Sequence, residues 1–167
     1  GVLAADAGTE KMQEIAGLIQ EGAMTYLRRQ FRTIAIILVP LVVVVFVTST
    51  AVDRPDGSEA LSFMSSGLFR TLAFLAGAAM SGLTGFLGMS MAVRGNVRTA
   101  AAARSGSMPA ALKVAFRTGG VAGMFCVGLG LLGATLIIMV FQNTSSAILI
   151  GFGFGGSLLA LFLRVGG

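Results

Sequence analysis

The feature that most constrains this chain is a stretch of 46 residues without a charged side chain, 118–163. A helix needs about 20 mainly apolar residues to cross a hydrocarbon core roughly 30 Å thick, so this stretch is long enough for two crossings. A polar cluster at 142–146 interrupts it and predicts a tight turn between two helices. Two earlier stretches also lack charges and are 20 and 23 residues long. We therefore expect four transmembrane spans, at about 33–52, 71–93, 118–141 and 147–167.

The composition supports the same class of protein. Of the 167 residues, 55% are hydrophobic and 11% are charged, against about 25% charged in an ordinary soluble domain. No long polar stretch remains for a second domain, so we predict one all-α unit over 1–167, a polytopic transmembrane helix bundle. The chain has no histidine and a single cysteine, Cys126, which excludes an internal disulfide and a Cys/His metal site.

The positive residues lie at the ends of the apolar stretches rather than on one soluble face, which argues against a nucleic-acid partner. By the positive-inside rule, the connections that carry them and both chain ends face the cytoplasm. A contact with anionic headgroups, an anionic substrate or a polyanion stays open at these clusters, and we assign no site there. The clusters are Arg28, Arg29 and Arg32 before the first span, and Arg94, Arg98, Arg104, Lys113 and Arg117 between the second and third.

Helical segments are also expected outside the spans. At 9–31, Thr9 can cap a helix whose apolar residues recur three or four apart, so we expect this amphipathic segment to lie along the inner membrane surface. The long basic connection divides at 105–107, where Ser-Gly-Ser follows an alanine-rich helix and precedes Pro109 in the first turn of the next helix. The second and third spans therefore extend into the cytoplasm.

Glycine accounts for 24 residues, about twice the usual share. Small residues four apart let membrane helices approach closely, so we predict helix contacts at these positions. Gly151, Gly153 and Gly156 also match a dinucleotide-binding pattern, which we reject because no strand precedes them and they lie within a predicted span. The predicted contact faces are Gly77-Ser81-Gly85, Gly119-Gly123, Gly130-Ala134, Gly151-Gly155 and Gly156-Ala160.

All acidic residues lie within the first 59 positions, and none falls inside a predicted span. Proton relays, Mg²⁺ sites and acid–base pairs commonly need carboxylates or histidine, so we predict no catalytic residue and no metal ligand in this chain. The sequence begins at Gly1 without methionine and stops within an apolar helix, so we expect a fragment. Arg164 has two interpretations: it extends to the inner membrane surface, or it lies within a larger bundle and pairs with carboxylates of other helices.

Four motifs follow one another in order between residues 8 and 167, and so run along nearly all of the chain: GTEKMQEIAGLIQEGAMTYLRRQFRT, AVRGNVRTAAAAR, KVAFRTGGVAGMFCVGLGLLG and GFGFGGSLLALFLRVGG. In these motifs the chain resembles the membrane-bound, ion-pumping inorganic pyrophosphatases, and it would supply the second to fifth of their sixteen helices. The resemblance implies a homodimeric enzyme that hydrolyses Mg²⁺-pyrophosphate on the cytoplasmic side and moves H⁺ or Na⁺ outward. The sequences AVRGNVR and AFRTGGVAGMF are similar to those of bacterial potassium-independent proton pumps. We therefore expect H⁺ rather than Na⁺, and a multi-pass protein of the bacterial inner membrane.

The resemblance also gives a role to one residue. The motif LFLRVGG matches the helix on which the family carries an arginine of its ion gate, which implies that Arg164 is a gate residue. The family's pyrophosphate and Mg²⁺ ligands and its gate carboxylates lie outside this chain, so we expect the chain alone to be inactive. A non-enzymatic channel or transporter module is the alternative, since the glycine faces and the missing carboxylates would suit it as well.

Overall fold

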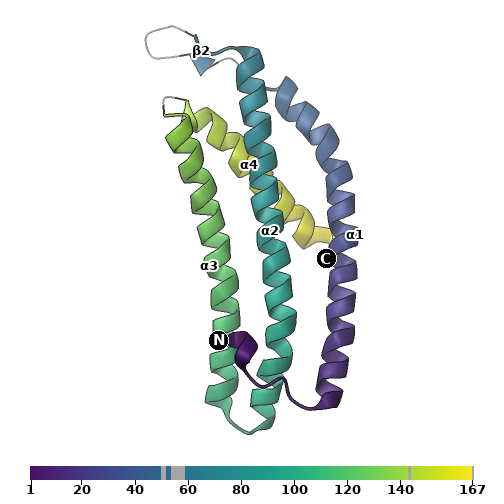
Figure 1. The fold of residues 1–167 in the computed structure, drawn as a ribbon. Coiled ribbons are helices and arrows are strands. Elements are labelled where there is room, and N and C mark those ends of the chain that lie inside the picture. The colour runs from purple at the N-terminus through teal and green to yellow at the C-terminus, as the bar shows by residue number, and fades with distance from the viewer. Residues whose placement is uncertain (50–51, 54–58, 143, 167) are drawn as a thin grey trace. The chain divides into compact units, whose positions relative to one another are not determined.

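The computed structural model describes residues 1–49, 52–53, 59–142 and 144–166. In this part of the chain, four long helices follow one another, and each is long and apolar enough to cross a membrane (Figure 1). The prediction of an all-α transmembrane class is confirmed, with one addition: a short antiparallel hairpin lies between the first two helices. The helices are α1 (Glu10–Val47), α2 (Phe63–Arg104), α3 (Met108–Val140) and α4 (Ser145–Gly166), and the strands are β1 (Val52–Asp53) and β2 (Glu59–Leu61).

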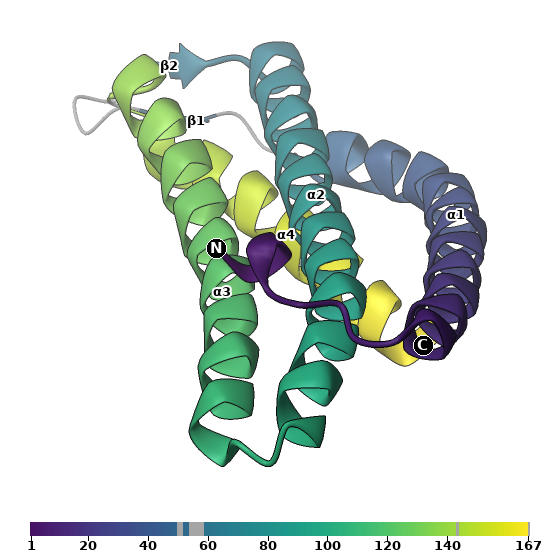
Figure 2. The same cartoon turned by 60° about the horizontal axis from the view of Figure 1, so that its bottom comes forward.

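The two predicted turns lie where polar residues and glycine interrupt the apolar pattern. The break at 105–107 is confirmed, because α2 ends at Arg104 and α3 begins at Met108 (Figure 2). Gly106 has φ +78° there, a left-handed conformation that glycine adopts without the steric cost a Cβ would add. The turn within the charge-free stretch is confirmed too, since α3 ends at Val140 and α4 begins at Ser145.

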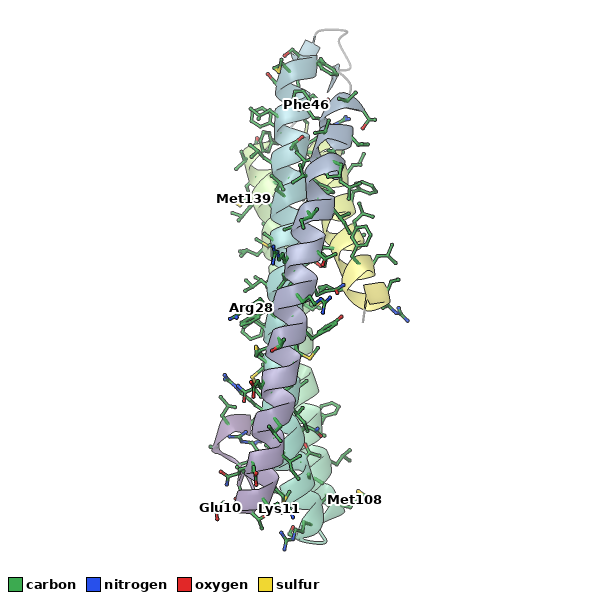
Figure 3. All side chains as sticks on the ribbon, turned by 90° about the vertical axis from the view of Figure 1, so that its right-hand side faces the viewer. Glu10, Lys11, Arg28, Phe46, Met108 and Met139 are labelled. Carbon is green, nitrogen blue, oxygen red and sulfur yellow. The ribbon has the colours of Figure 1, made fainter. Side chains whose placement is uncertain are left out.

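The predicted helix at 9–31 is confirmed, and its placement along the inner membrane surface stays a prediction. In the structure this segment is the first part of α1, which continues for 38 residues from Glu10 through Pro40 to Val47 (Figure 3). Thirty-eight helical residues extend about 57 Å, almost twice the roughly 30 Å hydrocarbon core. Helix α1 is therefore longer than a single crossing of the hydrocarbon core requires. Helix α1 also ends five residues before the expected end of the first span.

The chain divides into two compact units, each built from parts of several helices. The first unit contains Gly1–Arg29 and Thr84–Cys126, and the second contains Gln30–Leu83 and Val127–Gly167. In the first unit, Arg98 donates a hydrogen bond of 3.3 Å to the Leu3 carbonyl and ties the N-terminal segment to α2. Also within this unit, a Cβ added to Gly95 would lie 2.5 Å from Thr118 Oγ1, so α2 and α3 pack closely at this glycine.

Candidate functional site

Helix α4 is held against α2 by contacts between glycine and backbone carbonyl groups in the second unit. A Cβ added to Gly151 would lie 2.5 Å from the Arg70 carbonyl oxygen, and one added to Gly155 would overlap the Phe74 carbonyl. Both partners advance by four residues, so the two helices run in the same direction and meet where α4 crosses α2 (Figure 1). This arrangement confirms the predicted contact face at Gly151-Gly155, and lipid-buried helices gain van der Waals contact in this way.

The facing side of α2 contributes a glycine of its own. A Cβ added to Gly77 would overlap the carbonyl of Phe152, so neither helix could carry a side chain at these positions without separation of the backbones. Gly156 lies nearby, and its added Cβ would be 3.6 Å from the Gly77 carbonyl oxygen, an ordinary contact distance. The predicted contact role of Gly77 is therefore confirmed.

Apolar side chains hold the end of α4 that carries Arg164. Ile34 of α1, Ala78 of α2 and Leu159 of α4 form a buried cluster in which each residue is at most 4% exposed. Phe162 and Leu163 pack against this cluster from the last turns of α4. The buried apolar side chains therefore define one packed face of α4, which includes Gly155, Leu159, Phe162 and Leu163.

A hydrogen bond reinforces the same face. The side-chain amide of Gln30 on α1 donates to the carbonyl oxygen of Phe162, with an N···O distance of 2.9 Å. The bond is partly buried and joins residues 132 positions apart in the sequence. The sequence analysis did not single out Gln30. In the sequence, Gln30 is distinguished only as a neutral polar residue among the arginines that precede the first apolar stretch.

Arg164 lies on the side of α4 opposite this packed face. It follows Gly155 by nine residues, about two and a half helical turns, which places the two residues on opposite sides of the helix. In agreement, Arg164 is exposed, and no hydrogen bond or ion pair joins it to another residue that the structure describes. Gly153 lies three turns before Arg164 on the same side, and an added Cβ there would meet no atom within 4 Å. The guanidinium group is thus available to partners outside the described residues.

The predicted glycine faces of α3 have no neighbour in the described part of the chain. A Cβ added to Gly119, Gly123 or Gly130 would meet no atom within 4 Å. The glycine of α3 that does make a close contact is Gly133, where a Cβ would overlap the ring of Phe152 in the second unit. The sequence analysis missed Gly133 because it has no small residue four positions away in either direction.

The described residues offer no ligand set for a divalent cation. No group of three or more histidine, cysteine, aspartate or glutamate side chains comes together among them. The sequence explains this result, since no acidic residue occurs after Glu59. A Mg²⁺ ion prefers an octahedral set of oxygen ligands that includes carboxylates, and these residues do not fit that requirement.

Comparisons with known proteins give a consistent result. The sequence model of the family described as inorganic H⁺ pyrophosphatase matches residues 1–167. A K(+)-insensitive pyrophosphate-energized proton pump of Chloroflexus aurantiacus is 53% identical over 173 residues, which cover 99% of this chain and 22% of that protein. Proteins of the same description from Streptomyces coelicolor and Methanosarcina mazei are 45% and 42% identical, and the matches cover 21% and 22% of their lengths. The chain thus spans about a fifth of the length of these relatives.

Proposed function

The chain belongs to the inorganic H⁺ pyrophosphatase family, and on that premise we propose that it is part of a membrane pump that couples pyrophosphate hydrolysis to outward H⁺ movement. The observation that carries this proposal is the family match over all 167 residues, together with 53% identity to a proton pump. The relatives are described as K(+)-insensitive proton pumps: the words proton pump favour H⁺ over Na⁺ as the transported cation, and K(+)-insensitive favours a pump that does not need potassium.

The proposal includes a membrane arrangement. Four spans at about 33–52, 71–93, 118–141 and 147–167 cross the bilayer and place both ends of the chain in the cytoplasm. The positive residues of the α2–α3 connection support this orientation, since no acidic residue lies among them. The pump is a homodimer of the bacterial inner membrane, and the remaining helices of a sixteen-helix fold complete each subunit.

Within this pump, Arg164 is a residue of the ion gate. An unpaired arginine in the middle of a membrane costs about 2.5 to 3.5 kcal/mol on insertion scales, so it needs carboxylate partners from helices outside this chain. A positive charge beside a carboxylate lowers the pKa of that carboxylate and favours release of its proton. The exposed position of Arg164, on the side of α4 away from α2, supports this role.

The hydrolytic centre lies outside these residues. Mg²⁺, which binds and activates pyrophosphate in this proposal, is held by carboxylates that the described residues do not provide. The contribution of this chain is structural and electrostatic: the contacts between α2 and α4 hold the helix, and Arg164 supplies a fixed charge. The chain alone is therefore inactive.

Inverted membrane vesicles that contain the full-length protein test the proposal. Addition of pyrophosphate and Mg²⁺ is expected to acidify the vesicle interior, and a fluorescent pH indicator follows the change. The alternative, a non-enzymatic channel or transporter module, predicts ion flux without pyrophosphate hydrolysis. Vesicles in which pyrophosphate is neither hydrolysed nor coupled to H⁺ uptake would contradict the proposed function.

A further inference from the structure

The bond between Gln30 and Phe162 has a consequence for Arg164. Phe162 precedes Arg164 by two residues, which is about 200° around a helix. The Gln30 amide therefore holds α4 on the side that faces away from Arg164. We infer that Gln30 is a positioning residue for Arg164, because its amide fixes the rotation of α4 and thereby the direction in which Arg164 points.

The glycine contacts and the apolar contacts of α4 restrain this rotation less well near Arg164 than the Gln30 bond does. The glycine–carbonyl contacts are close and specific, but the last of them, at Gly155, lies seven residues before Phe162, about two turns away. Between Gly155 and Arg164, Leu159, Phe162 and Leu163 add apolar contacts to the packed face. Apolar contacts are not directional, so similar burial persists when a helix rotates by a modest angle. A hydrogen bond at 2.9 Å is lost under the same rotation.

The strength of a hydrogen bond between membrane helices sets how far the Gln30 bond restrains the rotation of α4. Interhelical hydrogen bonds in membrane proteins stabilise the bonded state about 3-fold on average and at most about 18-fold, by conversion of their measured energies. Removal of the Gln30 amide would raise the population of rotated α4 states, relative to the aligned state, by that factor. In the rotated states the charge of Arg164 would not reach its partners. Hydrolysis would continue in those states while H⁺ movement would not. This inference rests on the proposed gate role of Arg164.

The experiment compares four forms of the full-length protein: wild type, Gln30→Met, Arg164→Ala and the double variant. Methionine keeps the length of glutamine but removes the donor. Gln20→Met is the matched control, because Gln20 lies on the same helix, is partly buried, and makes no hydrogen bond to another described residue. The measurements are pyrophosphate hydrolysis, initial H⁺ uptake in vesicles, the pH profile of both, and the thermal stability of the purified protein.

We expect Gln30→Met to lower the ratio of H⁺ moved to pyrophosphate hydrolysed, by at most about 3- to 18-fold, because the aligned fraction of α4 cannot fall by more than the shift in its equilibrium. Gln20→Met should keep the wild-type ratio. The Gln30 effect should vanish in the Arg164→Ala background, because the positioning residue acts only through the arginine. Replacement of Gln30 by lysine, which also donates hydrogen bonds, should restore part of the ratio.

The outcomes separate the inference from the proposal beneath it. A wild-type ratio for Gln30→Met, while Arg164→Ala is uncoupled, overturns the positioning role and leaves the gate role standing. A wild-type ratio for Arg164→Ala overturns the gate role itself. Equal losses of hydrolysis and H⁺ uptake in Gln30→Met, with lower thermal stability and an unchanged pH profile, mean a purely structural role and also overturn the inference.

Discussion

Replacement of Gly155 by alanine tests the helix contact that orients α4. The added methyl group would overlap the Phe74 carbonyl of α2, and a backbone carbonyl cannot turn aside as a flexible side chain can. The two helices must therefore separate. Overpacking of this kind costs about 1 to 3 kcal/mol, which changes an unfolding equilibrium by about 5- to 160-fold.

Gly156→Ala is the matched control, because it follows Gly155 on the same helix and its methyl group would lie 3.6 Å from the Gly77 carbonyl oxygen, an ordinary contact distance. Alanine is intrinsically better than glycine in a helix by roughly 1 kcal/mol, and this gain applies to both variants, so it cancels in the comparison. Gly155→Ala should therefore be the less stable variant by the overpacking cost.

The assay unfolds the purified full-length variants with increasing SDS in mixed micelles and follows the folded fraction by far-UV circular dichroism. We expect the midpoint for Gly155→Ala to fall clearly below that for Gly156→Ala. Equal midpoints would mean that the Phe74 carbonyl does not contact Gly155. The placement of Arg164 on the opposite side of α4 would then lose its main support.

Two further predictions concern the first unit and the membrane orientation. Gly95→Ala should destabilise the protein by about 1 to 3 kcal/mol, because its Cβ would lie 2.5 Å from a threonine hydroxyl of α3, whereas Gly88→Ala on the same helix should be tolerated, because its Cβ would lie 4.0 Å from the Ala122 methyl group. The same SDS titration checks both, and equal stability would refute the close contact. In a cysteine-free background, Ser105→Cys should react with an impermeant maleimide only from the cytoplasmic side and Gln142→Cys only from the outer side. The opposite labelling would invert the orientation.

Much of the fold could be predicted from the sequence because charges are excluded from the hydrocarbon core. The absence of charges located the apolar helices, and polar residues with glycine located the turns at Gly106 and before Ser145. The contact face of α4 at Gly151 and Gly155 was also predictable, since small residues four apart let membrane helices pack closely, although the spacing did not name α2 as the partner. The local sequence was sufficient to predict the helices, the turns and the small-residue face, because each depends on residues that are close together in the chain.

Other features depend on contacts that the sequence does not display. The amphipathic pattern at 9–31 describes which residues share a face but not where the helix ends, and α1 continues from this segment to Val47. The close contact at Gly95 depends on which residue of α3 lies opposite, and Gln30 depends on a carbonyl 132 residues away. A Cβ added to Gly119 or Gly123 would meet no atom within 4 Å. The spacing of small residues therefore identifies a helix face that is able to pack, but it does not identify the helix that packs against it.

The most direct test of the central claim is the coupling ratio of Arg164→Ala in the full-length pump. Hydrolysis of pyrophosphate and H⁺ uptake are measured on the same inverted vesicles, with the amount of folded protein determined for each preparation. If α4 serves to present a fixed charge to the gate, the variant should fold and hydrolyse pyrophosphate but move much less H⁺ per molecule hydrolysed. A variant with the wild-type ratio would contradict the account, since the charge at Arg164 would then have no part in ion movement.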